Sequence, residues 1–355
     1  MYLTVCLRWL LALFGFSALP LAAGNPCEPV DGIQSICGLA APEDLVSAPN
    51  GRDLIFGQMA GPGGLYLLDT RDDSVHSLLP EPVPAPPDEL WGDPQCLRPV
   101  SRLEAHGLDI RRRLDGRWQL LVVNHAEQRE SVEFFELHNP LGDRPRARWR
   151  GCAEAPPAAN FNDVAALSDG SLLVTHMADR RWQLVNAVLA ALGRDTGFVY
   201  RWTRDAGFTP LPATRAPHPN GILLAPDEQT FYLNVYLGNV VQHRALPGGE
   251  LLAAVPVPKP DNASWAEDGR LLVASHEGTL WQIFRSLSQG HQRPSELPFS
   301  IIALDPVTLE PSTLLQRSGP PMGAGTVALQ RGHAVYIGSY VGDRIIRLPM
   351  PPQRP

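Results

Sequence analysis

The chain has 355 residues, 44% of them hydrophobic, and a formal net charge of −7. This length fits either two ordinary domains or one β-rich repeat protein, and the hydrophobic fraction excludes a largely disordered chain. The mild negative charge and the lack of a basic cluster disfavour nucleic-acid binding.

The first predicted element is a targeting segment at the N-terminus. Arg8 precedes an apolar run at residues 9–23 that ends in small residues. The run is long enough for a secretory signal peptide but shorter than the ~20 apolar residues of a membrane span. We therefore expect a signal peptide at residues 1–23, cleaved near Ala23, with an uncleaved anchor as the alternative. The mature protein would then be periplasmic or secreted.

Four cysteines follow the predicted signal: Cys27, Cys37, Cys96 and Cys152. An oxidising compartment favours two disulfides, and three pairings are allowed. Nearness in sequence favours Cys27 with Cys37 and Cys96 with Cys152. The cysteine spacing matches no zinc-binding pattern, so we expect structural disulfides.

A short phrase then recurs six times: a polar residue, an apolar strand, a turn and a second apolar strand. The copies are PEDLVSAPNGRDLIFGQ (42–58), AHGLDIRRRLDGRWQLLVVNH (105–125), FNDVAALSDGSLLVTH (161–176), PNGILLAPDEQTFYLNVY (219–236), PDNASWAEDGRLLVASH (260–276) and GAGTVALQRGHAVYIGSY (323–340). Strand-containing repeats at this scale predict an all-β fold, a six-bladed β-propeller, formed by residues 24–355 as a single domain. One terminus would add a strand to the blade made mostly by the other.

Three segments between the repeats carry further predictions. The run RRWQLVNAVLAALG (180–193) has helical spacing of apolar residues and is predicted to be the only helix, inserted after the start of the third blade. Its apolar stripe would pack on the blades as a lid or contact lipid, and we favour the lid. The proline-rich residues 80–94 are predicted to form a surface loop, and TLWQIF (279–284) an outer strand.

The residues that lead the repeats would meet at one mouth of the propeller channel. Glu43 and Asp261 offer two carboxylates, and Asn162, Asn220 and Asn262 offer three amide oxygens. Calcium prefers such oxygen ligands, and the lack of soft ligands argues against zinc or copper. Any one of these residues could instead form an Asx turn, but five at equivalent positions favour a calcium site.

A second pair of carboxylates lies one residue further along two of the repeats. Asp44 follows Glu43, and Asp163 follows Asn162. Because neighbouring residues of a strand point to opposite sides, we expect both aspartates to face deeper into the channel. They would hold a second, buried calcium, or they would be salt-bridged or solvated.

Two histidines of the second repeat form a candidate proton relay. His106 takes the leading position, and His125 ends the second strand of the same repeat. A close histidine pair suits general-base catalysis, with one imidazole deprotonating water and the other relaying the proton. The chain has no GxSxG motif, so a metal-activated water is the favoured nucleophile. His276, which ends the second strand of the fifth repeat, is expected to line the pocket.

Six of these segments together resemble the serum paraoxonase/arylesterase family in residue type, order and spacing. They are AHGLDI, LLVVNH, FNDVAAL, PNGILLAPD, PDN and GTVAL. The resemblance covers nearly the whole mature chain, and the same propeller superfamily includes the senescence-marker/gluconolactonase lactonases. Members of the paraoxonase family are six-bladed propellers with one catalytic and one structural calcium, and they hydrolyse lactones and aryl esters.

The resemblance implies a role for each matched residue. Its implied ligands are Glu43, Asn162, Asn220, Asp261 and Asn262 for the catalytic calcium, and Asp44, Asp163 and the backbone carbonyl of Leu108 for the structural calcium. His106 and His125 match the histidine dyad of the family. The family also closes its propeller with a disulfide to the C-terminal strand, but no cysteine follows Cys152 here. Closure is therefore expected to rest on strand hydrogen bonds.

The expected function is calcium-dependent hydrolysis of lactones or aryl esters, with the histidine dyad or a carboxylate ligand as the base. Two alternatives are a non-catalytic extracytoplasmic binding propeller and a strictosidine synthase-like enzyme. A binding scaffold does not need the full set of calcium ligands, and the strictosidine synthase-like group lacks it. Both alternatives are therefore less favoured.

Overall fold

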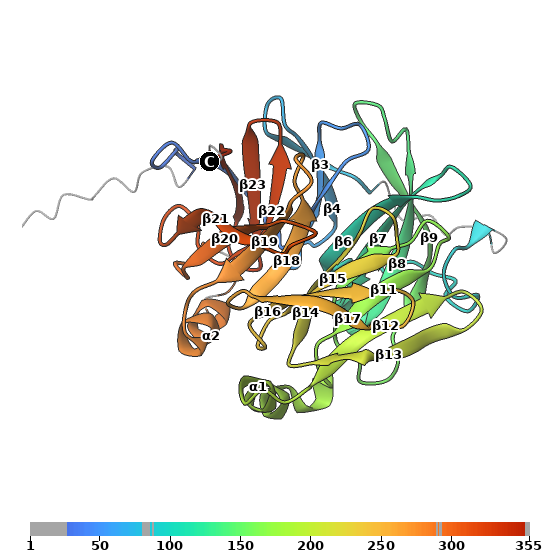
Figure 1. Cartoon of the computed structure of the whole chain (residues 1–355). Helices are drawn as coiled ribbons and strands as arrows, with labels where there is room; N and C mark the ends of the chain where they lie inside the picture. Colours follow the sequence, from blue (N-terminus) through green and yellow to red (C-terminus); the bar gives the residue numbers. More distant parts are fainter. Residues whose placement is uncertain (1–26, 80–85, 87–88, 289, 291–292, 352–355) are drawn as a thin grey trace, which may run out of the picture.

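The computed structural model describes residues 27–79, 86, 89–288, 290 and 293–351. Six four-stranded antiparallel sheets are arranged as the blades of a propeller (Figure 1), which confirms the predicted six-bladed fold. The predicted signal peptide lies outside the described residues. None of the helices in the described part is long and apolar enough to cross a membrane.

Each blade follows the chain from its innermost strand to its outermost strand, apart from the last blade. Blade 1 is β2 (Leu45–Ser47), β3 (Leu54–Gly57), β4 (Leu65–Asp69) and β5 (Ser74–Ser77), and blade 2 is β6 (Ala105–Arg112), β7 (Trp118–Asn124), β8 (Ser131–His138) and β9 (Arg146–Glu154). Blade 3 is β10 (Phe161–Ala166), β11 (Leu172–His176), β12 (Gly197–Thr203) and β13 (Gly207–Ala216), and blade 4 is β14 (Pro219–Leu224), β15 (Thr230–Val235), β16 (Val240–Ala245) and β17 (Leu251–Pro256). Blade 5 is β18 (Pro260–Trp265), β19 (Leu271–His276), β20 (Phe299–Leu304) and β21 (Pro311–Arg317).

Blade 6 closes the ring with strands from both ends of the chain. It contains β22 (Gly325–Arg331), β23 (Ala334–Ser339) and β24 (Arg344–Pro349), with β1 (Gln34–Cys37) as its outermost strand. β1 pairs antiparallel with β24, and Ser35 lies opposite Ile346. Strand hydrogen bonds therefore close the propeller, as predicted. The Cys27–Cys37 disulfide ties the segment before β1 to its last residue.

The core lies between neighbouring blades because both faces of each sheet are apolar. Leu45 and Phe56 of blade 1 pack with Tyr336 and Ile345 of blade 6 in one buried cluster. Similar clusters join the other five pairs of adjacent blades, and buried aromatic residues fill several of them. This sheet-on-sheet packing fixes the positions of the inner strands around the channel.

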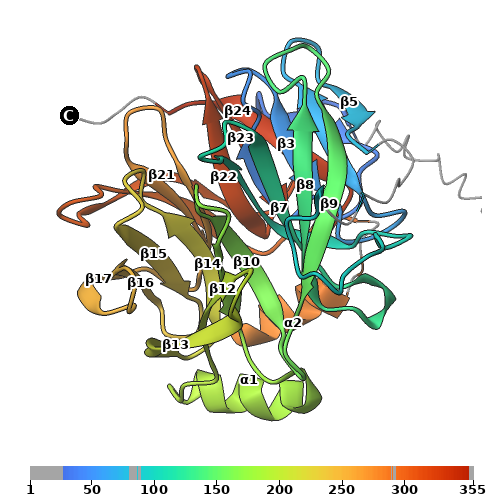
Figure 2. The same cartoon turned by 90° about the vertical axis from the view of Figure 1, so that its right-hand side faces the viewer.

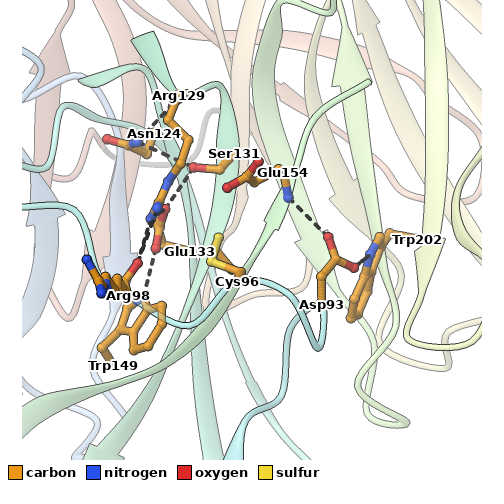
Figure 3. The surroundings of a disulfide bond; sticks show 11 residues. Asp93, Cys96, Arg98, Asn124, Arg129, Ser131, Glu133, Trp149, Glu154 and Trp202 are labelled. Carbon is orange, nitrogen blue, oxygen red and sulfur yellow. Dashed lines mark hydrogen bonds and ion pairs between the residues drawn. A yellow bond between two sulfur atoms is a disulfide. The ribbon is translucent and has the colours of Figure 1, made fainter. Parts of the chain in front are cut away.

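The second disulfide joins Cys96 to Cys152, so both predicted pairings are confirmed (Figure 3). It fastens the segment before blade 2 to β9, where the backbone N–H of Trp91 also donates to the carbonyl of Arg150 (2.7 Å). Leu90 and Trp91 are buried. Residues 80–85, 87 and 88 of the predicted surface loop at 80–94 lie outside the described residues. The described remainder forms no strand, as expected of a loop, but the prediction of a surface position is wrong for Leu90 and Trp91, which pack beside β9 of blade 2. Glu154 lies close enough to both sulfur atoms to share a metal ion with them, but disulfide-bonded sulfur atoms are not thiolate ligands.

Two short α-helices extend from the propeller in the described part of the chain, one more than predicted. In blade 3, a 3₁₀ turn at Arg180–Trp182 leads into α1 (Gln183–Ala191) within the predicted range. The prediction of a strand at 279–284 is wrong, because α2 (Leu280–Ser288) occupies this segment and β20 fills the strand position. Leu280, Ile283, Phe284 and Leu287 have helical spacing, which the short apolar run concealed. Figures 1 and 2 show both helices on the same side of the molecule.

Candidate active site

The leading residues of blades 2 to 6 lie at β-bulges. The first strand of each of these blades slips in register against the second strand within its first few residues. The residues released from regular pairing are His106 and Gly107, Asn162 and Asp163, Asn220 and Gly221, Asp261 and Asn262, and Thr326. A bulge re-aims side chains at the end of a strand, so the same irregularity repeated around the ring can direct these groups into the channel mouth.

Two glycines let neighbouring inner strands approach closely at the bulges. A Cβ atom on Gly107 would lie 2.5 Å from the Cα of Asp163, and one on Gly221 would lie 2.4 Å from the carbonyl oxygen of Asp261. Both distances are too short for any side chain. The sequences His-Gly and Asn-Gly in the repeats therefore reflect close backbone contact across the channel mouth.

Glu43 lies in the connection that leads into β2 of blade 1 and is only 1% exposed. Its backbone carbonyl accepts a hydrogen bond from the Thr326 hydroxyl (2.6 Å), which joins blade 6 to blade 1. Its Oε1 accepts from the Asn262 amide (2.7 Å) and lies 3.8 Å from Nε2 of His106. The Asn162 amide nitrogen lies 3.3 Å from the same histidine nitrogen. The structure thus brings groups from five repeats into one cluster.

Four buried oxygens of the predicted ligand set accept no hydrogen bond from the described residues. They are Glu43 Oε2, Asn162 Oδ1, Asn220 Oδ1 and Asn262 Oδ1. A buried polar atom without a partner costs about 1–3 kcal/mol, so four of them at one mouth indicate a missing partner rather than imperfect packing. Hard oxygen donors with two nearby carboxylates fit a calcium ion.

The charges of the cluster are also uncompensated. Burial, followed by the nearby charges of Asp44, Asp261 and Asp163, raises the pKa of Glu43 well above its usual value. Burial and the charge of Asp44 raise the pKa of Asp261 to about 8. A divalent cation would stabilise the ionised forms and reverse both shifts.

Asp44 and Asp163 face a cavity of about 220 Å³ in the channel, which Leu108 also lines. Neither aspartate forms an ion pair with a described lysine, arginine or histidine, so the salt-bridged alternative finds no support. Burial raises the pKa of Asp44 to about 7, and burial and the charge of Asp44 raise that of Asp163. Two buried carboxylates without a cationic side chain fit a second cation between the inner strands.

A related aspartate, Asp109, was missed by the sequence reasoning. Its Oδ2 accepts the backbone N–H of Ala166 in blade 3 (2.7 Å). Asp44 makes the same contact to Leu108 in blade 2, and Asp163 to Ile222 in blade 4, both at 2.7 Å. These three carboxylates therefore link the inner strands of four consecutive blades, in addition to any metal that they bind.

The predicted histidine pair is in contact. His106 Nδ1 lies 2.8 Å from His125 Nε2, and burial, followed by the charge of His125, lowers the pKa of His106 well below its usual value. His125 Nδ1 lies 2.8 Å from Oε2 of Glu130, a residue that the sequence reasoning did not single out. A low pKa keeps His106 neutral and able to accept a proton.

His276, which is predicted to line the pocket, lies beside Asp261. Its Nε2 is 3.6 Å from Oδ2 of Asp261, and its Nδ1 is 2.8 Å from the Tyr236 hydroxyl. The rings of Tyr236 and Tyr340 meet the imidazole edge-on at 5.7 and 5.6 Å. Burial lowers the pKa of His276 to about 4.

A second ring of residues thus surrounds the mouth, one from the end of each blade's second strand. Its members are Gln58, His125, His176, Tyr236, His276 and Tyr340. Every repeat copy ends on one of these residues, so the signal was present in the sequence. Most of the leading residues carry side-chain oxygens, whereas five of the six residues of this second ring carry an imidazole or a phenol group, Gln58 being the exception.

No protein-family model matches the chain, and no curated protein is similar to it in sequence. Similar solved structures include a gluconolactonase from Xanthomonas campestris, with a TM-score of 0.52 and 17% identity over 90% of this chain and 89% of that one. A luciferin-regenerating enzyme has a TM-score of 0.52 and 14% identity over 89% and 94% of the two chains. An aldose sugar dehydrogenase from Streptomyces coelicolor, bound to PQQ, has a TM-score of 0.50 and 14% identity over 89% and 97%.

These similarities show the propeller fold, which gluconolactonase-like proteins share. The same fold carries a hydrolase and a dehydrogenase among these neighbours, so the fold alone does not decide the chemistry. The function has to be argued from the residues at the channel mouth.

Proposed function

We propose that the protein is a calcium-dependent hydrolase of lactones and aryl esters, using an activated water. The observation that carries this proposal is the group of four buried oxygens without partners beside a histidine pair. The paraoxonase/arylesterase resemblance supports the same assignment, and the gluconolactonase among the structural neighbours supports a lactone substrate. The two disulfides fit an oxidising compartment outside the cytoplasm.

The residues divide the work as follows. Glu43, Asn162, Asn220, Asp261 and Asn262 would hold the catalytic calcium, and Asp44, Asp163 and the Leu108 carbonyl the structural one. The bound catalytic calcium would polarise the substrate carbonyl as a Lewis acid. His106 Nε2 would take a proton from the attacking water while its Nδ1–H hydrogen bonds to His125. Glu43 or Asp261 is the alternative base, because their carboxylates would lie beside the same water.

The test is a substrate panel of homoserine lactones, aliphatic lactones and phenyl acetate, assayed with calcium and after treatment with EGTA. We expect turnover that EGTA removes and calcium restores, with lactones preferred. Asn220→Ala and Asp261→Ala should be nearly inactive, and Glu104→Gln is a control carboxylate that lies near the mouth and pairs with Arg102 (2.8 Å). A protein that binds calcium but turns over no ester or lactone would favour the non-catalytic binding propeller. Turnover of phenyl acetate without any lactone would overturn only the substrate preference.

We further propose that α1 contacts a lipid surface at this mouth. The apolar stripe predicted at 180–193 does not pack as a lid: Leu184 is 80% exposed, and Val185, Val188 and Leu192 are also exposed. On α2, Trp281 is 70% exposed, and α1 and α2 follow the second strands of their blades at the end that bears the site. Arg180 and Arg194 flank α1, and Arg285 lies in the last turn of α2, which favours an anionic surface.

Co-sedimentation with vesicles of mixed anionic and zwitterionic lipid would test this contact. Leu184→Asp combined with Trp281→Asp should lose binding. Val307→Asp is the matched control, because Val307 is 84% exposed in the β20–β21 turn at the opposite end. If the double variant binds the vesicles as well as Val307→Asp does, the helices are not the lipid contact.

A further inference from the structure

Glu130 stands at the far end of the histidine pair and belongs to no predicted site. It immediately precedes β8, in the hairpin between β7 and β8 of blade 2, and its side chain is only 8% exposed. One carboxylate oxygen, Oε2, lies 2.8 Å from His125 Nδ1. The other, Oε1, accepts the backbone N–H of Phe161, the residue before Asn162.

These contacts determine which nitrogen of each imidazole carries the proton. A carboxylate can only accept, so the hydrogen of the His125–Glu130 bond must lie on His125 Nδ1. In a neutral His125, Nε2 is then an acceptor, and the hydrogen of the 2.8 Å bond to His106 must lie on His106 Nδ1. The lone pair of His106 is consequently on Nε2, the atom that faces Glu43 and Asn162.

The orientation of Asn162 agrees with this order. Its Nδ2 is 3.3 Å from His106 Nε2 and can donate to that lone pair, which leaves its Oδ1 among the four oxygens without a partner. The opposite histidine tautomers would put an N–H against the Asn162 amide N–H. One carboxylate thus sets a consistent series of donors and acceptors from Glu130 to the predicted calcium ligand.

The segment that carries Glu130 is held firmly on both sides. The Asn124 side chain accepts the N–H of Ala126 and donates to the Arg129 carbonyl, both at 3.1 Å. Arg129 in turn reaches Glu133 (2.9 Å), and the Glu130 carbonyl accepts the N–H of Ala155 (2.9 Å). Figure 3 shows Asn124, Arg129 and Glu133 joined in this network beside the Cys96–Cys152 disulfide.

We propose that Glu130 is a positioning residue, which fixes the tautomers of His125 and His106 so that His106 Nε2 presents its lone pair to the attacking water. This inference rests on the proposed hydrolase function. When a water O–H bond breaks, the proton goes to His106 Nε2, and the remaining hydroxide oxygen bonds to the carbonyl carbon. The negative charge of Glu130 stabilises the positive charge then shared by the two imidazoles, and the proton returns to the leaving oxygen.

Glu130→Gln tests the assignment because glutamine has one acceptor oxygen for two donors. If that oxygen stays with Phe161, the glutamine N–H₂ faces His125 Nδ1 and favours the opposite tautomers. Loss of the orienting carboxylate of a Ser-His-Asp triad costs about 10⁴-fold in kcat. Because Glu130 acts one residue further away, we expect a loss of about 10²-fold in kcat, with KM changed less than about threefold. Glu133→Gln is the matched control, since this buried carboxylate three residues away touches neither histidine.

Two readouts separate positioning from a merely structural role. In a His106→Gln background, Glu130→Gln should cause no further loss, because both changes remove the same base. The increase in melting temperature on adding calcium should be unchanged in Glu130→Gln. A further loss in that background, or a weaker calcium response, would show that Glu130 acts by supporting Asn162 through Phe161 and would overturn the assignment.

The decisive measurement does not depend on activity. Nitrogen-15 NMR of histidine-labelled, calcium-loaded protein, with His106→Gln and His125→Gln to assign two of the ten histidines, reads each tautomer directly. We expect both imidazoles to be protonated on Nδ1 in the wild type and in Glu133→Gln, and this pattern to be lost in Glu130→Gln. The opposite tautomer in the wild type would refute the proposal. An inactive protein with the expected tautomers would refute the hydrolase function but retain the role of Glu130 in orienting the pair.

Discussion

Replacing Glu43 by glutamine should separate the calcium response of this protein from its intrinsic stability. Glutamine keeps the shape of the side chain and can still accept the Asn262 amide at Oε1, the one hydrogen bond that the carboxylate group accepts. The change removes a charge that burial and three aspartates disfavour in the calcium-free protein. In EGTA at pH 8, Glu43→Gln should therefore be at least as stable as the wild type.

The calcium response should change in the opposite direction. Calcium at 100 times its dissociation constant stabilises a protein by about 2.7 kcal/mol. An unfolding entropy of about 2.1 cal/mol/K per residue gives about 0.7 kcal/mol per degree for this length, so that stabilisation raises the melting temperature by about 4 °C. Loss of one of two charged ligands should weaken binding at least 100-fold and remove most of this rise at the same calcium concentration.

The assay is thermal unfolding at pH 5 and pH 8, with EGTA and with calcium, for the wild type, Glu43→Gln and the control Glu104→Gln. At pH 8 the two variants should differ in the calcium response and in the stability that Glu43→Gln gains in EGTA, which Glu104→Gln should not gain. At pH 5 the advantage of Glu43→Gln in EGTA should disappear, because the raised pKa leaves Glu43 protonated there. A full calcium response in Glu43→Gln would refute its role as a ligand. A large loss of stability in EGTA would show that its charge supports the fold.

Three further predictions concern pH, the base and the outer disulfide. In EGTA, the free energy of unfolding should fall as pH rises from about 6.5 to 8. Burial raises the pKa of Asp44 to about 7 and that of Asp261 to about 8, and the stability that a raised carboxyl pKa contributes is lost as pH rises through the pKa of the folded state. Burial lowers the pKa values of His218 and His276 to about 4, so these groups oppose this trend only below pH 6.5. Calcium should flatten the trend. A melting temperature in EGTA that rises between pH 6.5 and 8 would contradict the predicted direction. His106→Gln should keep its fold and its calcium response in thermal unfolding but lose turnover by ~10²–10⁴-fold, and unchanged turnover on every substrate would move the base to Glu43 or Asp261. Replacing Cys96 and Cys152 by alanine should lower the free energy of unfolding, measured with denaturant, by up to about 4 kcal/mol, and replacing Cys27 and Cys37 by up to about 3 kcal/mol. The first disulfide closes a separation of 56 residues and the second only 10, so the first should stabilise more. A larger loss for the Cys27–Cys37 pair would show that strand β1 depends on its disulfide more than loop closure alone predicts.

The sequence predicted the leading ring of the site because the repeats encode it. A polar residue at the start of the second to sixth copies becomes a bulge residue at the channel mouth, so equivalence in sequence becomes nearness in space. The same reasoning could have found Tyr236 and Tyr340, since they end their copies as His276 ends its own. Their phenol groups do not fit a calcium shell, so a prediction based on calcium ligands does not select them.

Other features could not be read from the repeats. Glu130 touches Phe161 across 31 residues of chain, and Asp109 reaches Ala166 across 57, so both contacts exist only once neighbouring blades are packed. The segment of α2 is predicted as a strand because a short apolar run fits either a strand or a helix. The structure excludes the strand because another segment fills that position in the sheet. β20 is that segment.

The site also depends on how the ring is closed. Glu43 belongs to blade 1, whose neighbour across the closure is blade 6, and its carbonyl accepts the Thr326 hydroxyl of that blade. Its side chain reaches past blade 6 to Asn262 of blade 5. The strands that complete blade 6 come from opposite ends of the chain and are held together by strand hydrogen bonds and by side-chain packing, so no hairpin connection joins them. A cation held by Glu43, Asp261 and Asn262 would join blades 1 and 5 directly across blade 6. In this arrangement the charges that make the calcium-free mouth costly are the ones that secure the ring once the cation is bound.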